Sequence, residues 1–155
     1  MNNYSIREII EMAVQTEVLG NRFYIKMAQK FKKNAELADL FTTLAAKEKT
    51  HEKTFLELKR MVAKSGPKVV EWDEVTSYMR AFVESEFFLG NSKSLPSLTR
   101  IRTAKSAVQF ALGFEKETLL YFMELRRIVK EKEIVDEVIN EEKSHIMWLA
   151  AFKNA

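Results

Sequence analysis

The chain has 155 residues, with 25 Lys and Arg against 22 Asp and Glu, a net charge of +3, and no cysteine. This length suits one compact domain, and the absence of cysteine excludes disulfides, thiolate-bound metals and cysteine nucleophiles within the chain. Only two histidines, four glycines and two prolines are present, which favours a mainly helical protein in which the position of each histidine is informative.

The composition and the first residues of the chain predict a cytoplasmic protein. Glu8 and Glu11 interrupt the apolar residues near the start, unlike the apolar core of a signal peptide. No stretch has the roughly 18 consecutive apolar residues of a membrane span. Basic residues occur in short clusters such as 30–33 and 126–130, which are typical of solvated helix ends, so we expect no membrane and no nucleic acid as a partner.

The predicted elements, in chain order, begin with two helices. The first has a capping-box pattern at Ser5 and Glu8, and Asn34 suits the N-cap of the second. The sequence Ser65-Gly66-Pro67 ends the second helix. The first two helices are therefore predicted over about residues 5–33 and 35–64.

The second half of the chain is predicted to contain a long crossover and two more helices. The crossover covers about residues 66–102 and includes a short helix over about 73–88, where the apolar pattern is weaker. The last two helices are predicted over about 103–130 and 133–153, and their boundary contains neither glycine nor proline. Residues 1–155 are thus expected to form a single all-α domain.

Each long segment carries apolar residues at alternating steps of three and four. This spacing places them on one helix face and is typical of the core stripe of a helix bundle. Two helices, a long crossover and two further helices predict a four-helix bundle with one long connection.

Each of the four stripes contains a glutamate near its middle, where an apolar residue is expected. These glutamates are Glu17, Glu48, Glu115 and Glu142. Two of them precede His51 and His145 by three residues, a step that brings both side chains to one helix face, one turn apart. Other nearby glutamates are out of phase with the stripes and are excluded as ligands: Glu52, Glu117 and Glu141.

Four buried carboxylates need positive charge beside them, because even one isolated buried carboxylate costs several kcal/mol. No Lys or Arg falls in the stripes. Two divalent metal ions would balance the four charges, and two imidazoles complete a nitrogen and oxygen ligand set that suits iron or manganese. Two alternatives stay open: a buried polar network without metal, and stripes that face solvent.

At these positions the sequence resembles the ferritin superfamily, and specifically the rubrerythrin-like di-iron carboxylate proteins. The resemblance lies in the two Glu-x-x-His pairs and in three stretches, Ala13–Glu17, Tyr24–Ala28 and Ala107–Lys116. It implies a ferritin-like four-helix bundle whose six Glu and His residues bind two iron ions, with manganese as the alternative metal.

The resemblance also implies a role for each carboxylate. By analogy Glu48 and Glu142 bridge the two metals, whereas Glu17 and Glu115 are terminal ligands. Rubrerythrins commonly carry a further glutamate three residues after the third-helix ligand, and Thr118 stands at that position. The site therefore looks closer to the six-ligand pattern of bacterioferritins and oxygen-activating relatives.

The function implied by the resemblance is a di-iron oxidoreductase that reduces hydrogen peroxide or oxygen, with no catalytic residue beyond the metal ligands. Full-length rubrerythrins add a cysteine-ligated iron domain, which this cysteine-free chain cannot form. Electrons are therefore expected from a separate donor such as a rubredoxin-type protein. Three alternatives stay open: a ferroxidase that stores iron, a di-iron oxygenase of an organic substrate, and a metal-free structural bundle.

Side chains around the six residues give further expectations. Tyr24 shares a face with Glu17 and either hydrogen-bonds a ligand carboxylate or is a plain core residue. Tyr121 lies off its stripe and is not expected at the site. Gly20 and Ala111 either leave room for a substrate or for oxygen, or allow close helix packing.

The aromatic residues of the crossover bear on the oligomeric state. They are Trp72, Phe82, Phe87 and Phe88. They either cover the bundle or form an exposed patch for self-association, and a homodimer is the expected assembly.

Overall fold

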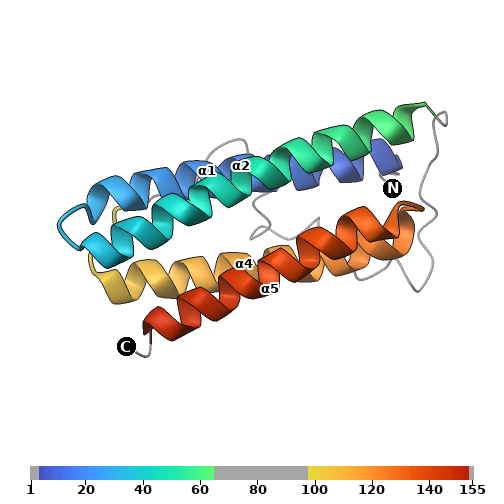
Figure 1. The fold of residues 1–155 in the computed structure, drawn as a ribbon. Helices are drawn as coiled ribbons and strands as arrows, with labels where there is room; N and C mark the ends of the chain where they lie inside the picture. Colours follow the sequence, from blue (N-terminus) through green and yellow to red (C-terminus); the bar gives the residue numbers. More distant parts are fainter. Residues whose placement is uncertain (1–3, 65–97, 154–155) are drawn as a thin grey trace.

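A computed structural model describes residues 4–64 and 98–153 of the chain. Four long α-helices make up this part (Figure 1), namely α1 (Ile6–Lys30), α2 (Ala35–Ala63), α4 (Ala104–Ile128) and α5 (Lys132–Lys153). The all-α four-helix bundle predicted from the sequence is confirmed, and the observed helix ends lie within three residues of the predicted ones. The short helix and the aromatic residues predicted in the crossover lie outside the described residues.

The helices form two antiparallel pairs, α1 with α2 and α4 with α5, stacked as two layers (Figure 1). The turn between α1 and α2 and the turn between α4 and α5 lie at opposite ends of the bundle. In consequence α2 ends at one end and α4 begins at the other, as expected for two pairs linked by a long crossover. Across the layers, α1 contacts α4 and α2 contacts α5.

Side-chain caps define where three of the helices begin. Ser5 accepts a hydrogen bond from the Glu8 amide at the start of α1, and Asn34 accepts one from Leu37 at the start of α2. Both N-caps were predicted from the sequence. The start of α4 has a reciprocal capping box between Thr103 and Ser106, which satisfies two otherwise unpaired groups of the first turn.

The apolar core is divided into two clusters along the bundle. One cluster lies toward the start of α1 and includes Ile10, Phe55, Phe122 and Val138. The other lies toward the end of α1, and its members are Phe23, Tyr24, Met27, Leu37, Phe41, Leu44, Ala45, Ile101, Ala107, Val108, Ala111, Leu112 and Leu149. On every helix the predicted glutamate lies between the residues of the two clusters, so each carboxylate is placed where apolar packing is interrupted.

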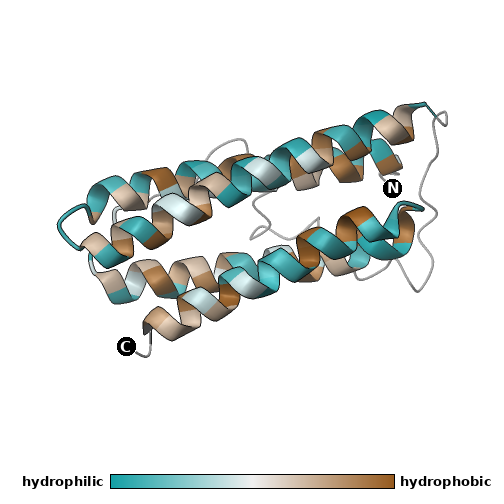
Figure 2. Cartoon of the chain, viewed as in Figure 1, coloured by the Kyte–Doolittle hydropathy of each residue, from teal (hydrophilic) through white to brown (hydrophobic). Residues whose placement is uncertain are grey.

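The helices are amphipathic. Hydrophilic and hydrophobic residues alternate along each of them (Figure 2), and the apolar side chains of the two clusters are buried. None of the described helices is both long enough and apolar enough to cross a membrane.

Candidate metal centre

The six residues predicted as ligands meet in the middle of the bundle, and all are at most 1% exposed. Their ligand atoms form two groups, in each of which the atoms lie within 4.8 Å of one another. One group is Glu17, Glu48, His51 and Glu142, and the other is Glu48, Glu115, Glu142 and His145. The two groups share Glu48 and Glu142, so the structure contains two adjacent candidate positions for a metal ion.

Both histidines turn the same ring nitrogen toward the carboxylates. His51 Nδ1 lies 3.0 Å from Glu142 Oε1 and 3.6 Å from Glu17 Oε2. His145 Nδ1 lies 3.6 Å from both Glu48 Oε1 and Glu115 Oε1. The two rings are roughly parallel, with centroids 5.5 Å apart. Nδ1 is therefore the nitrogen that each ring offers to a metal.

The site contains buried polar atoms that the protein itself does not satisfy. Within the described residues, the buried side-chain oxygens and nitrogens without a hydrogen-bond partner all belong to five of the six residues: Glu17, Glu48, Glu115, Glu142 and His145. Buried polar atoms are normally paired, because each unpaired one costs free energy. An oxygen-rich set completed by two imidazoles fits iron or manganese, so these residues suit a pair of such ions.

Mutual repulsion helps to raise the pKa of Glu48 and Glu142, the two carboxyl groups that both candidate metal positions share. Burial, together with the charges of Glu17, Glu115 and Glu142, raises the pKa of Glu48 well above its ordinary value. Burial and the charges of Glu115 and Glu17 likewise raise the pKa of Glu142. Without metal, protons take the place of the missing positive charge, and a metal ion must displace them in order to bind.

Tyr24 connects the apolar core to the site. Its hydroxyl donates a hydrogen bond to Glu115 Oε1 at 2.6 Å, as one of the two readings of the sequence expected. Burial opposes ionisation of Glu115, but the contacts with Glu142 and His145 and the Tyr24 hydrogen bond outweigh it and lower the pKa of Glu115 to about 2. Tyr24 thereby holds the Glu115 carboxylate in position and adds to the contacts that keep it charged.

Glu141 is the main residue that the sequence argument missed. Its helical phase excludes it as a ligand, yet its Oε2 lies 2.6 Å from His51 Nε2. Burial opposes protonation of His51, but the contacts with Glu17 and Glu141 outweigh it and raise the pKa of His51. Glu141 is not in either group of candidate ligand atoms, so it holds the far side of the ring. Its position directly before Glu142 was the available signal, because a long side chain there can reach the facing helix.

Two more expectations are settled by packing. Tyr121 does not hydrogen-bond the six residues, as expected: it is fully buried, and its hydroxyl donates to the Ile9 carbonyl at 2.6 Å. At Gly20 a Cβ atom would lie 2.9 Å from Glu48 Oε2 and 2.9 Å from a Phe114 ring carbon. The space beside Gly20 is therefore taken up by close packing.

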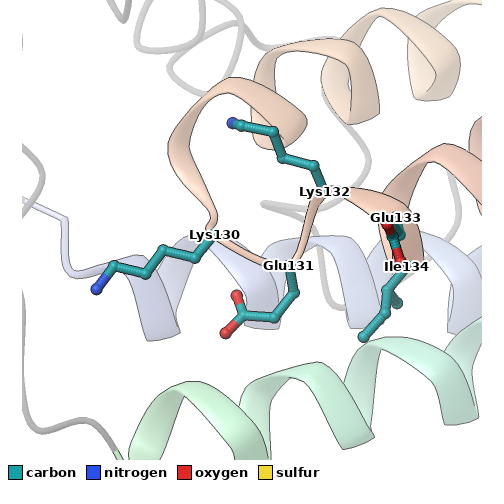
Figure 3. Close-up of a pocket in the computed structure, with 5 residues that line it drawn as sticks. All are labelled: Lys130, Glu131, Lys132, Glu133 and Ile134. Atoms are coloured by element: carbon teal, nitrogen blue, oxygen red, sulfur yellow. The ribbon is translucent and has the colours of Figure 1, made fainter.

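A surface hollow of about 410 Å³ lies at the α4–α5 turn, apart from the six residues, and is lined by residues 130–134 (Figure 3). The side chains of Lys130, Glu131 and Lys132 point in different directions from the turn. The Lys132 ammonium donates to the carbonyls of Arg126 and Val129 at 2.6 and 3.2 Å. The hollow is thus part of the structure that ends α4.

Comparisons with known proteins agree with this geometry. The sequence model of a family described as Rubrerythrin matches residues 8–104, more than half of the chain. A search of curated proteins finds no significant match. Among solved structures, the chain is similar to a protein from Thermotoga maritima described as a candidate ferritin-like diiron-carboxylate protein, with a TM-score of 0.71 and 20% identity over 99% of this chain and 97% of the other. At this identity the likeness shows a shared fold.

Proposed function

Because the chain belongs to the rubrerythrin family, we propose that it is a di-iron carboxylate oxidoreductase that reduces hydrogen peroxide or oxygen. The observation that carries the proposal is the buried cluster of four glutamates and two histidines, with its unpaired oxygen and nitrogen atoms between two apolar clusters. A pair of reduced iron ions supplies the two electrons that convert hydrogen peroxide and two protons into two molecules of water.

The ligand roles in this proposal follow the two overlapping groups of atoms. Glu48 and Glu142 belong to both groups and would be the ligands shared by the two ions. Glu17 with His51 completes one position, and the second position is completed by Glu115 with His145. Four carboxylates then balance the charge of two divalent ions, which removes the repulsion that the metal-free site contains.

The rest of the chain prepares this site. The two apolar clusters pack on either side of the ligands and exclude bulk water from the bundle at both ends. Exclusion of water strengthens the attraction between the carboxylates and a metal ion. Thr118 is buried and its hydroxyl donates to the Phe114 carbonyl at 2.8 Å, so this position supplies no seventh ligand.

Electrons in this proposal come from another protein. The sequence contains no cysteine, so the chain itself holds no cysteine-ligated iron centre. A separate donor, such as a rubredoxin-type protein, fits this composition. A homodimer and a cytoplasmic location remain predictions from the sequence.

Metal analysis of the purified protein tests the proposal. After anaerobic reconstitution with ferrous iron, we expect about two iron ions per chain, and we expect hydrogen peroxide to oxidise them faster than oxygen does. Fewer than about one ion per chain would contradict the di-iron assignment. Oxidation by oxygen but not by hydrogen peroxide would exclude the peroxidase branch and leave the oxidase.

A matched pair of variants locates the site. His51→Ala removes a buried nitrogen that faces Glu142 and is expected to prevent binding of a pair of ions. Glu52→Ala removes a neighbouring carboxylate that pairs with Lys49 at 2.9 Å and should leave the iron content unchanged. Equal loss in both variants would show that the assigned helix face is wrong.

A further inference from the structure

The outward-facing nitrogens of the two histidines have different surroundings. His51 Nε2 lies 2.6 Å from Glu141 Oε2. His145 Nε2 is also buried, but no residue in the described ranges 4–64 and 98–153 gives it a hydrogen-bond partner. The ring of His145 instead lies against that of Trp148, with centroids 5.5 Å apart. One ring is therefore held by a carboxylate and the other by packing alone.

The sequence explains the difference. The two Glu-x-x-His pairs differ in the residue directly before their glutamate. This residue is Glu141 before Glu142 and Lys47 before Glu48. When Nδ1 binds a metal, Nε2 carries the proton and can only donate a hydrogen bond. A carboxylate accepts that bond, whereas the ammonium group of Lys47 has no acceptor. The residue pattern thus provides a hydrogen-bond acceptor for Nε2 of His51 but not for Nε2 of His145.

The two terminal carboxylates, Glu17 and Glu115, also differ in a way that favours the metal position at His51. Glu115 Oε1 already accepts a hydrogen bond from Tyr24 at 2.6 Å, which draws electron density away from the metal. Both oxygens of Glu17 lack a hydrogen-bond partner among the described residues. The group that contains His51 therefore has the stronger terminal carboxylate as well as the supported histidine.

From these contacts we infer that the two metal positions are unequal, so that the ion at His51 and Glu17 binds first and the ion at His145 and Glu115 binds second and more weakly. The inference rests on the proposed di-metal function and adds an order of filling to it. An outer carboxylate on a ligating histidine fixes the ring and raises its basicity, and its loss typically costs roughly 10- to 100-fold in metal affinity. Glu141 acts here as a positioning residue, and Lys47 stands at the corresponding position of the other pair.

Titration of the metal-free protein with Co²⁺, followed by visible absorption and by calorimetry, tests the order. We expect two binding steps whose dissociation constants differ at least about tenfold. His145→Ala should keep the tight step and lose the weak one, whereas His51→Ala should lose the tight step. Two steps of equal affinity, or loss of the tight step in His145→Ala, would overturn the inference while leaving the di-metal proposal intact. Failure of the unaltered protein to bind two ions would instead contradict the proposed function.

Two substitutions should each reduce the difference between the two steps, one by weakening the tight step and the other by tightening the weak step. Glu141→Ala should weaken the tight step roughly 10- to 100-fold, and Lys47→Glu should tighten the weak step by a comparable factor, because it supplies the missing carboxylate. The matched control is Glu137→Ala, which removes the same charge from an exposed position one turn before Glu141 on α5. If Glu137→Ala had an effect as large as that of Glu141→Ala, Glu141 would act only through its charge. That result would overturn its assignment as a positioning residue.

Discussion

At the scale of single residues, Gly20 shows how tightly the ligands are packed. Its α-hydrogen faces a space that is bounded by Glu48 Oε2 and the Phe114 ring, both 2.9 Å from where a Cβ atom would be. At Gly113, on α4, no atom of the described residues outside the local helix backbone lies within 4 Å of the corresponding point. The two glycines therefore offer the same substitution in a crowded and in an open environment.

Gly20→Ala is expected to weaken metal binding. The added methyl group displaces the Glu48 carboxylate, which lies in both groups of candidate ligand atoms. Gly113→Ala should leave metal binding unchanged and raise the free energy of unfolding by about 0.5–1 kcal/mol, because alanine is the better helix former. Urea unfolding of the metal-free variants and Co²⁺ titration measure both effects. A Gly20→Ala protein with the stability gain of Gly113→Ala and unaltered affinity would contradict the packing argument.

The same scale shows what the sequence could predict about the site. The glutamates and histidines were identifiable because each interrupts an apolar stripe. Periodicity excludes Glu141 as a ligand and Tyr121 from the site, in agreement with the structure, but it does not predict the contacts that these two side chains make. A helix in a bundle contacts two neighbours, so its buried arc is wider than a single stripe. Tyr121 fills the α1–α4 contact through its bond to Ile9, and Glu141 reaches across to α2. Contacts of this kind depend on how each helix is rotated, which periodicity alone does not give.

At the scale of elements, cap residues mark some helix ends, whereas a lysine side chain from the next helix marks the end of α4. The caps Ser5 and Asn34 were identifiable from residue type alone. The end of α4 has no glycine or proline, and the carbonyls of Arg126 and Val129 there accept hydrogen bonds from the ammonium of Lys132. An exposed ion pair between Arg126 and Asp136 joins α4 to α5 beside the same turn. A lysine that folds back on the preceding helix has no sequence pattern as specific as a cap residue.

Thr103 provides a test at this scale, because α4 carries Glu115 and begins at the Thr103 cap. Thr103→Ala removes the acceptor for the Ser106 amide and should lower the free energy of unfolding by about 1 kcal/mol. The control is Thr42→Ala, in which an exposed mid-helix threonine bonded to the Ala38 carbonyl is replaced by a better helix former. Thr42→Ala should be neutral or slightly stabilising in urea unfolding. Equal effects of the two substitutions would refute the cap.

At the scale of the whole molecule, the bundle combines two apolar clusters with a charged middle. The clusters stabilise the fold, whereas the four carboxyl groups between them oppose it until a cation or protons neutralise them. Replacing one repelling group, as in Glu17→Gln, should therefore raise the stability of the entire metal-free bundle. The protein keeps these groups in its core at a cost in stability, which is typical of a functional site.

Metal-free protein is accordingly expected to lose stability as the pH rises from about 5 to about 8. The folded pKa values of Glu48 and Glu142 lie above the ordinary value of 4.5, so above that pH the folded state retains protons that the unfolded chain has released. Each retained proton lowers the free energy of unfolding by about 1.4 kcal/mol per pH unit, up to the folded pKa. The raised pKa of His51 acts in the same direction above its ordinary value of 6.5. Glu115, with a pKa lowered to about 2, affects stability only below about pH 4.5.

Thermal or urea unfolding in the presence of a chelator, across this pH range, measures the slope. Glu48→Gln, which cannot ionise, should flatten it. Metal affinity should change in the opposite sense and increase with pH, because the same protons must leave before an ion binds. Stability of the metal-free protein that rises between about pH 5 and about pH 8 would show that the buried carboxyl groups are neutralised by something other than protons.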